Sequence, residues 1–266
     1  MLKFDPDDLL IDLGLINLVG PFKNNDEKIK FEKNIKKVHP RYLEEDNSFY
    51  QYNNKGYRTK NIENLDKEFV LIFGCSYTEG VGLHNNHIWC NVLLDNIGID
   101  RLNLAKAGTG PDIQYYNTVQ YIKCNYPKPK LVIFQWPEST RKSFTYYEDN
   151  NLFLKHHHTA SKTATKDTKW YLRRYCMDQS ELQTNNYFWI TAATMLWNQI
   201  GVPVFNWSWQ GDYYNDYYNV KYVQTSNTGY DKLKNRARDC SHDGPEKHKQ
   251  TADILFKDVD NLLKNC

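Results

Sequence analysis

The sequence has no long uncharged apolar run and no excess charge of one sign. No segment is apolar for long enough to cross a bilayer, and the acidic, proline-containing start lacks the basic and apolar parts of a secretory signal. Lys and Arg together number 34 and Asp and Glu 32, which leaves no strong footprint for nucleic acid or a membrane surface. We therefore expect a soluble protein without a nucleic-acid partner or membrane span. It would be cytoplasmic, or released or virion-associated if viral, and its oligomeric state is not predicted.

Closely spaced metal or redox cysteines are also lacking. No two of the six cysteines form a Cys-x-x-Cys pair, which argues against structural zinc and thioredoxin-like chemistry. The run His156-His157-His158 fits a solvated loop better than a metal site, and a packing or capping role is expected for His248. Gly80 and Gly82 are not followed by the lysine that a phosphate-binding loop needs. We expect neither a metal nor a cofactor.

Two distant segments together supply a nucleophile, a base and an orienting acid. An apolar run, residues 69–73, leads into Gly74-Cys75-Ser76-Tyr77-Thr78-Glu79-Gly80, and the second segment reads Asp239-Cys240-Ser241-His242. A serine hydroxyl attacks an acyl carbon well only when an imidazole takes its proton and a carboxylate orients that imidazole. The sequence thus predicts Ser76, His242 and Asp239 as a catalytic triad.

The spacing distinguishes between families of serine hydrolases. Thr78 stands where an α/β-hydrolase elbow needs glycine, and the acid lies only three residues before the histidine. The two blocks resemble those of the SGNH, or GDSL, hydrolases, which read Gly-Asp-Ser-x-Thr/Ser-x-Gly and Asp-x-x-His. The version with Cys75 in place of aspartate looks like SGNH-type domains encoded by bacteriophages. The resemblance covers about residues 66 to 266 and implies a serine esterase.

The resemblance also implies an oxyanion hole. Its expected donors are the backbone N–H groups of Ser76 and Gly108, the latter in the loop before a helix that opens at Pro111. The family usually has Gly-x-Asn-Asp after its third strand, whereas this chain has Gln135-Trp136-Pro137-Glu138, so Gln135 is the candidate replacement for the asparagine amide. A missing donor would cost about 10²–10³ in turnover. Trp136 and Tyr77 are the candidate substrate-binding residues.

Strands alternate with helices along the chain, which predicts an α/β fold with three layers, α/β/α, around a mainly parallel, flavodoxin-like sheet. Expected strands are residues 69–73, 101–105, 131–134 and 202–209. Three helices are expected. The first begins at Pro111 and has Ile113, Tyr116, Val119 and Ile122 on its buried face; the second covers residues 186–200; the third begins near Pro245. We expect an N-terminal extension, 1–66, packed on an SGNH-like domain, 67–266, with insertions at about 139–185 and 210–236.

The predicted function is hydrolysis of short acyl esters, including O-acetyl groups on carbohydrate, through an acyl-enzyme. The partner is a small-molecule or carbohydrate ester. Two alternatives remain open: a transacylase that uses the same triad, and a non-catalytic glycan-binding or virion structural module that keeps only the scaffold.

Overall fold

The computed structural model describes residues 2–3, 7–12, 15–22, 28–35, 49–138, 141–148, 151–158, 179–209, 220–225, 236–239 and 242–265. Its centre is a five-stranded, wholly parallel sheet in the order β11-β10-β7-β5-β6. The strands are β5 (Phe69–Phe73), β6 (Asp100–Asn103), β7 (Leu131–Gln135), β10 (Val204–Ser208) and β11 (Lys221–Tyr222). Numbered along the chain, this order is 2-1-3-4-5, the flavodoxin-like order. The prediction of a flavodoxin-like parallel sheet is confirmed.

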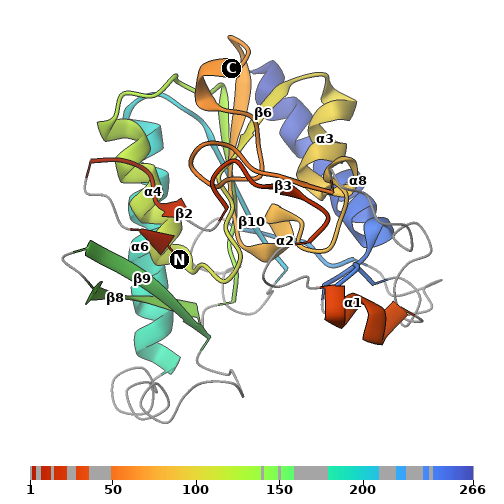
Figure 1. The fold of residues 1–266 in the computed structure, drawn as a ribbon. Helices are drawn as coiled ribbons and strands as arrows, with labels where there is room; N and C mark the ends of the chain where they lie inside the picture. The colour runs from red at the N-terminus through yellow and green to blue at the C-terminus, as the bar shows by residue number, and fades with distance from the viewer. Residues whose placement is uncertain are drawn as a thin grey trace.

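Helices cover both faces of this sheet (Figure 1). On one side pack α4 (Pro111–Lys123) and α6 (Gln179–Gln199), and on the other α3 (Trp89–Ile97) and α8 (Pro245–Lys264). Alternate side chains of each strand enter opposite cores because β-strand residues point to opposite faces. In β5, Phe69, Leu71 and Phe73 join the core on the α4/α6 side, and Val70 and Ile72 the core on the α3/α8 side.

Two helices differ from the sequence expectation. The helix expected over 186–200 begins seven residues earlier, because α6 starts at Gln179. In α4 the expected apolar face is only partly buried. The fully buried side carries polar residues instead, which hydrogen-bond into the core: Gln114, Asn117 and Thr118.

Residues 1–66 interleave with the rest of the chain. Strands β1 (Leu2–Lys3) and β2 (Ile11–Asp12) extend the hairpin β8 (Arg141–Glu148) and β9 (Asn151–His158) into a four-stranded antiparallel sheet. Strands β3 (Val19–Gly20) and β4 (Tyr50–Gln51) pair with each other, and a short helix, α1 (Lys28–Asn34), lies between them in sequence. The three histidines thus lie in β9 rather than in the expected loop, because residues 151–158 pair with β8 as an antiparallel strand.

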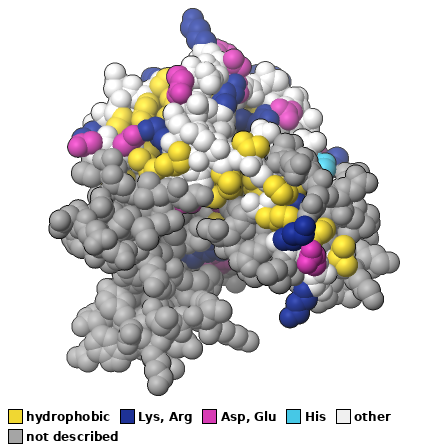
Figure 2. Space-filling model, in the orientation of Figure 1, with side chains coloured by type: hydrophobic (Ala, Val, Ile, Leu, Met, Phe, Trp, Pro, Cys, Tyr) yellow, Lys and Arg dark blue, Asp and Glu magenta, His cyan; other side chains and the backbone are white. Residues whose placement is uncertain are grey.

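Several apolar side chains of this N-terminal part are buried in the two cores, among them Phe49, Tyr50, Tyr52 and Tyr57. Over the described part of the face drawn in Figure 2, Lys and Arg side chains are interspersed with Asp and Glu. No helix among the described residues is long and apolar enough to span a membrane.

Candidate active site

Ser76 lies where ligands usually bind in parallel α/β sheets, just beyond the carboxyl end of a strand at the point where the strand order reverses. It is the first residue of the short helix α2 (Ser76–Glu79), three residues after β5 ends. The helix ends at Gly80, which adopts a left-handed conformation with φ 77°. The turn that carries Ser76 is thereby held between the buried strand β5 and the glycine that ends α2. Ser76 itself is only 7% exposed.

His242 and Asp239 reach Ser76 from a loop before α8. Nε2 of His242 lies 2.8 Å from Oγ of Ser76, and Nδ1 of the same ring lies 2.5 Å from Oδ2 of Asp239. The other carboxylate oxygen, Oδ1, accepts the backbone N–H of His242 at 3.1 Å. One carboxylate therefore orients both the ring and the backbone of His242, and the tautomer with hydrogen on Nδ1 leaves Nε2 able to accept the Ser76 proton.

Backbone contacts fasten the loop that carries the acid and the base. The N–H of Arg238 donates to the carbonyl of Gly82 at 2.8 Å, and the N–H of Ala237 donates to the carbonyl of His242 at 3.2 Å. Gly82 has φ 76°, and a Cβ there would lie 2.9 Å from both Ala237 Cβ and the backbone nitrogen of Asp239. Glycine is needed at this position because both its conformation and the close approach of the loop leave no room for a side chain.

The loop of Gly108 is attached to the Ser76 turn. The backbone N–H of Lys106 and the hydroxyl of Thr109 both donate to the carbonyl of Gly74, at 3.1 and 3.3 Å. Gly108 itself is exposed, with φ 83°. A second link comes from α2, because Oε2 of the buried Glu79 accepts the N–H of Ala107 at 2.6 Å.

Glu79 also connects the site with the N-terminal part of the chain. Its Oε1 accepts the hydroxyl of Tyr52 at 2.7 Å. Burial, together with the neighbouring Glu79 carboxylate, raises the pKa of Tyr52 well above its usual value, so the phenol stays a donor. Nearby, the buried Arg58 guanidinium donates to the carbonyls of Phe49 and Leu83, both at 2.6 Å, and to that of Gly80.

Gln135 is not positioned as the sequence led us to expect. The side chain is fully buried, and its Oε1 accepts the backbone N–H of Cys75 at 3.2 Å and the Thr78 hydroxyl at 3.0 Å. Its Nε2 donates to the carbonyl of Trp136 at 2.9 Å. Because the amide comes two residues before the position of the family's asparagine and points into the core, it supports the Ser76 turn from behind and does not line the pocket beside Ser76.

Of the two expected substrate-binding residues, only Tyr77 lines that pocket. Trp136 is fully buried, stacks on Phe134 with ring centroids 4.6 Å apart, and donates from Nε1 to Asn206 at 3.0 Å. Its place in the core follows from the alternation of strand β7. The prediction for Trp136 is therefore wrong.

The pocket at Ser76 has a volume of about 510 Å³, within the range of small-ligand sites. Aromatic and charged side chains that the sequence reasoning had not singled out share its wall with Ser76, Tyr77 and His242: Glu138, Arg141, Trp207, Trp209, Tyr222, Asp243 and Lys247. The charged side chains form two ion pairs of opposite charge. Arg141 Nε lies 2.5 Å from Glu138 Oε2, and Lys247 Nζ lies 3.0 Å from Asp243 Oδ2.

His248 has the packing and capping role expected from the sequence. Its fully buried ring stacks on Tyr77 at a centroid distance of 4.0 Å, and Nδ1 accepts the N–H of Trp89 at 3.1 Å in the first turn of α3. Burial, with a smaller effect of His242, lowers the pKa of His248 well below its ordinary value. Across the described ranges, His, Cys, Asp and Glu side chains form no group of three or more that could hold a metal ion.

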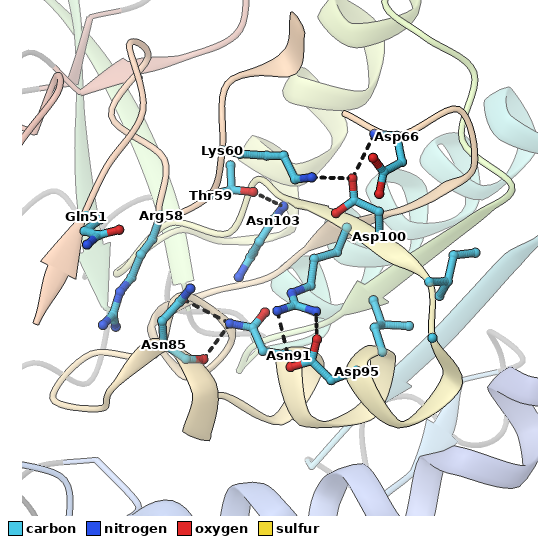
Figure 3. Close-up of a pocket in the computed structure, with 14 residues that line it drawn as sticks. Gln51, Arg58, Thr59, Lys60, Asp66, Asn85, Asn91, Asp95, Asp100 and Asn103 are labelled. Carbon is cyan, nitrogen blue, oxygen red and sulfur yellow. Dashed lines mark hydrogen bonds and ion pairs between the residues drawn. The ribbon is translucent and has the colours of Figure 1, made fainter. Parts of the chain in front are cut away.

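A second pocket, of about 620 Å³, lies beside the edge strand β6 (Figure 3). Its charged side chains are largely paired with one another. Lys60 Nζ lies 2.7 Å from Asp100 Oδ2, and Arg101 forms an ion pair with Asp95 at 2.5 Å. It contains neither serine nor histidine, so it offers no nucleophile and base of the kind found at Ser76.

Neither a protein-family model nor a curated protein matches this sequence. Solved structures with a similar chain path include a carbohydrate esterase family 2 enzyme with a carbohydrate-binding domain from Corynascus thermopiles (Myceliophthora fergusii). That match has a TM-score of 0.43 at 13% identity and covers 75% of this chain and 68% of the other.

An acetyl xylan esterase, Est2A, from the rumen bacterium Butyrivibrio proteoclasticus matches with a TM-score of 0.47 at 13% identity, over 74% of this chain and 64% of that one. TesA matches with a TM-score of 0.40 at 13% identity, over 73% of this chain and 99% of the TesA chain. This chain therefore spans less than two thirds of Est2A. Similarity of this degree assigns no activity, which has to follow from the side chains of the site itself.

Proposed function

We propose that this chain is a serine ester hydrolase of the SGNH type, with Ser76 as nucleophile, His242 as general base and Asp239 as the acid that orients it. The observation that carries the proposal is the continuous path from Ser76 Oγ through the His242 ring to Asp239, with steps of 2.8 and 2.5 Å, at the wall of a pocket. Hydroxyl, imidazole and carboxylate in this order make up the arrangement that activates a serine.

In the first half-reaction, Ser76 Oγ bonds to the ester carbonyl carbon while its proton passes to His242 Nε2. The carbonyl π electrons move onto oxygen, where the N–H groups of Ser76 and Gly108 are the proposed backbone donors. The carbon–oxygen bond to the alcohol then breaks, and His242 returns its proton to the departing alkoxide. Water repeats the sequence on the acyl-enzyme and releases the acid and free Ser76.

The pocket supports a small ester whose alcohol part is polar. The aromatic residues Tyr77 and Trp209 line the pocket together with the charged pairs of Arg141 with Glu138 and Lys247 with Asp243. Apolar ring faces and fixed polar atoms together suit the two sides of a sugar ring. We therefore propose short acyl esters, including O-acetyl groups on carbohydrate, as substrates.

The test is hydrolysis of p-nitrophenyl acetate and acetylated sugars by the native chain and by Ser76→Ala. We expect turnover by the native chain and none by Ser76→Ala, because the variant lacks the attacking hydroxyl. Equal inertness of both proteins on a broad ester panel, together with binding of a glycan, would refute the hydrolase in favour of a binding module. Acyl transfer to an added sugar or alcohol that outcompetes water would identify a transacylase.

A further inference from the structure

An oxyanion hole built from two backbone N–H groups leaves room for a third donor. Preorganised donors at the developing negative charge are usually the largest single contribution to acyl transfer. Gln135 does not serve in this role, because its amide is fully buried behind the Ser76 turn and engaged with Cys75, Thr78 and Trp136. A third donor has to come from another side chain that lines the pocket.

Arg141, the first residue of β8, lies at the junction of the two loops that would form the hole. On one side its positive charge acts on the thiol of Cys75, the residue that precedes Ser76: burial raises the pKa of that thiol, and the charge of Arg141 opposes the rise. On the other side its carbonyl packs against Gly110, where a Cβ would lie 2.7 Å from Arg141 O. Arg141 lines the same pocket as Ser76 and His242. It is thus held between the Ser76 turn and the end of the Gly108 loop.

The charge on Arg141 is retained and its side chain is largely buried. The side chain is only 13% exposed and approaches Glu138 through Nε, at 2.5 Å from Oε2. Burial alone would lower the pKa of Arg141, but the neighbouring Cys75 and Glu138 raise it above its usual value. The contact with Glu138 is made through Nε, and the terminal amino groups carry the remaining N–H donors of the guanidinium. A guanidinium is planar and offers these donors in a fixed geometry.

We propose that Arg141 is a catalytic residue whose terminal N–H groups donate to the substrate carbonyl oxygen, in place of the side-chain amide that the family resemblance leads one to expect. The inference rests on the proposed esterase function. Arg141 gains its hydrogen bonds to oxygen as the bond from Ser76 Oγ to carbon forms, and it transfers no proton. The only proton moved in that step passes from Ser76 to His242. When the carbonyl re-forms, the oxygen loses its negative charge and the bonds to Arg141 weaken.

The experiment compares Arg141→Gln with the native chain in the hydrolysis of p-nitrophenyl acetate. We expect kcat to fall by about 10²–10³-fold, the usual effect of removing one oxyanion donor, while KM changes little. A boronic acid that forms an anionic tetrahedral adduct with Ser76 should lose affinity by a similar factor, because it mimics the transition state. Arg101→Gln is the matched control: it removes an arginine that forms an ion pair with Asp95 at the second pocket, beside β6, and it should leave kcat unchanged.

A purely structural role for Arg141 predicts different results. Arg141→Gln leaves Glu138 without its partner, so the double variant Arg141→Gln/Glu138→Gln replaces the ion pair with two neutral side chains. We expect this double variant to keep the native melting temperature and still to show the loss in kcat. Guanidinium ion added at a non-denaturing concentration should restore part of the activity of Arg141→Ala. A double variant with native kcat, or an unchanged boronate affinity, would overturn the proposal. An inert native chain would refute the esterase function and this inference with it, whereas an active native chain with unaffected Arg141→Gln refutes the inference alone.

Discussion

Replacing Gln135 with leucine tests whether this side chain supports the Ser76 turn or faces the substrate. Its Oε1 accepts the backbone N–H of Cys75 and the hydroxyl of Thr78, and its Nε2 donates to the carbonyl of Trp136. Leucine has nearly the same volume but no polar atom. The substitution therefore removes hydrogen bonds without opening a large cavity.

The expected cost follows from which partners keep another bond. The carbonyl of Trp136 also accepts the Ser208 hydroxyl at 3.0 Å, so it stays satisfied. The N–H of Cys75 and the O–H of Thr78 lose their acceptor in a fully buried place. Each buried donor left unsatisfied costs about 1–3 kcal/mol, so the loss at these two donors should lower the free energy of unfolding of Gln135→Leu by about 2–6 kcal/mol. At about 2–4 °C per kcal/mol for a chain somewhat shorter than this one, the melting temperature should fall by roughly 4–24 °C.

The assay is thermal and urea unfolding followed by circular dichroism, with Gln199→Leu on the exposed end of α6 as the matched control. The control should change the free energy of unfolding by less than about 0.5 kcal/mol. If Gln135→Leu unfolds like the native chain and loses only turnover, Gln135 acts on the substrate and the supporting role described here is wrong.

Three further substitutions test other buried contacts around the site. Glu79→Gln keeps only one of the two oxygens that accept the N–H of Ala107 and the hydroxyl of Tyr52, so it should loosen the Gly108 loop and lower kcat about tenfold. Tyr52→Phe should mainly lower the melting temperature. Equal kcat values for Glu79→Gln and the native chain in steady-state assays would contradict the role of Glu79. Because burial depresses the pKa of His248 in the folded chain, the unfolded chain binds the extra proton first, so stability should fall as pH drops below about 6.5, by at most about 1.4 kcal/mol per pH unit from this group. Urea unfolding between pH 7.5 and 5 should show a smaller decline for His248→Asn, and identical pH dependence of the two proteins would count against the role of His248.

Most of the parallel sheet could be predicted because strands such as residues 69–73 and 131–134 are short, continuous apolar runs, each followed by a turn or helix signal. The edge strand β11 (Lys221–Tyr222) was not predicted, and it lies within the insertion expected at about 210–236. The hairpin of β8 and β9 and its pairing with β1 were not predicted, because such pairing depends on contacts between distant polar segments with no periodicity of their own. The polar buried face of α4 was missed for a related reason. A buried Asn117 is favourable only where Tyr57 and Leu10 supply partners, and a single helix does not reveal them.

At the site, the sequence predicted which side chains the structure brings together at Ser76, because both motifs have a fixed local spacing. Trp136 and Gln135 were assigned wrongly because residues at the end of a strand point to alternate sides, and the sequence does not tell which side faces the pocket. Arg141 gave no local signal at all. Its relation to Cys75 and Gly110 arises only once β8 folds back over the loop before α4.

Arg58 shows that the first sixty residues matter for chemistry far along the chain. Its guanidinium joins the carbonyl of Phe49 to those of Gly80 and Leu83, immediately after the helix that begins with Ser76. A shortened protein starting at residue 67 would still contain the serine, the histidine and the aspartate. It would nevertheless leave the carbonyl groups of Gly80 and Leu83, close after Ser76, without their shared cation, so trimming to the apparent minimal unit should yield a poorly formed site rather than a smaller protein with the same one.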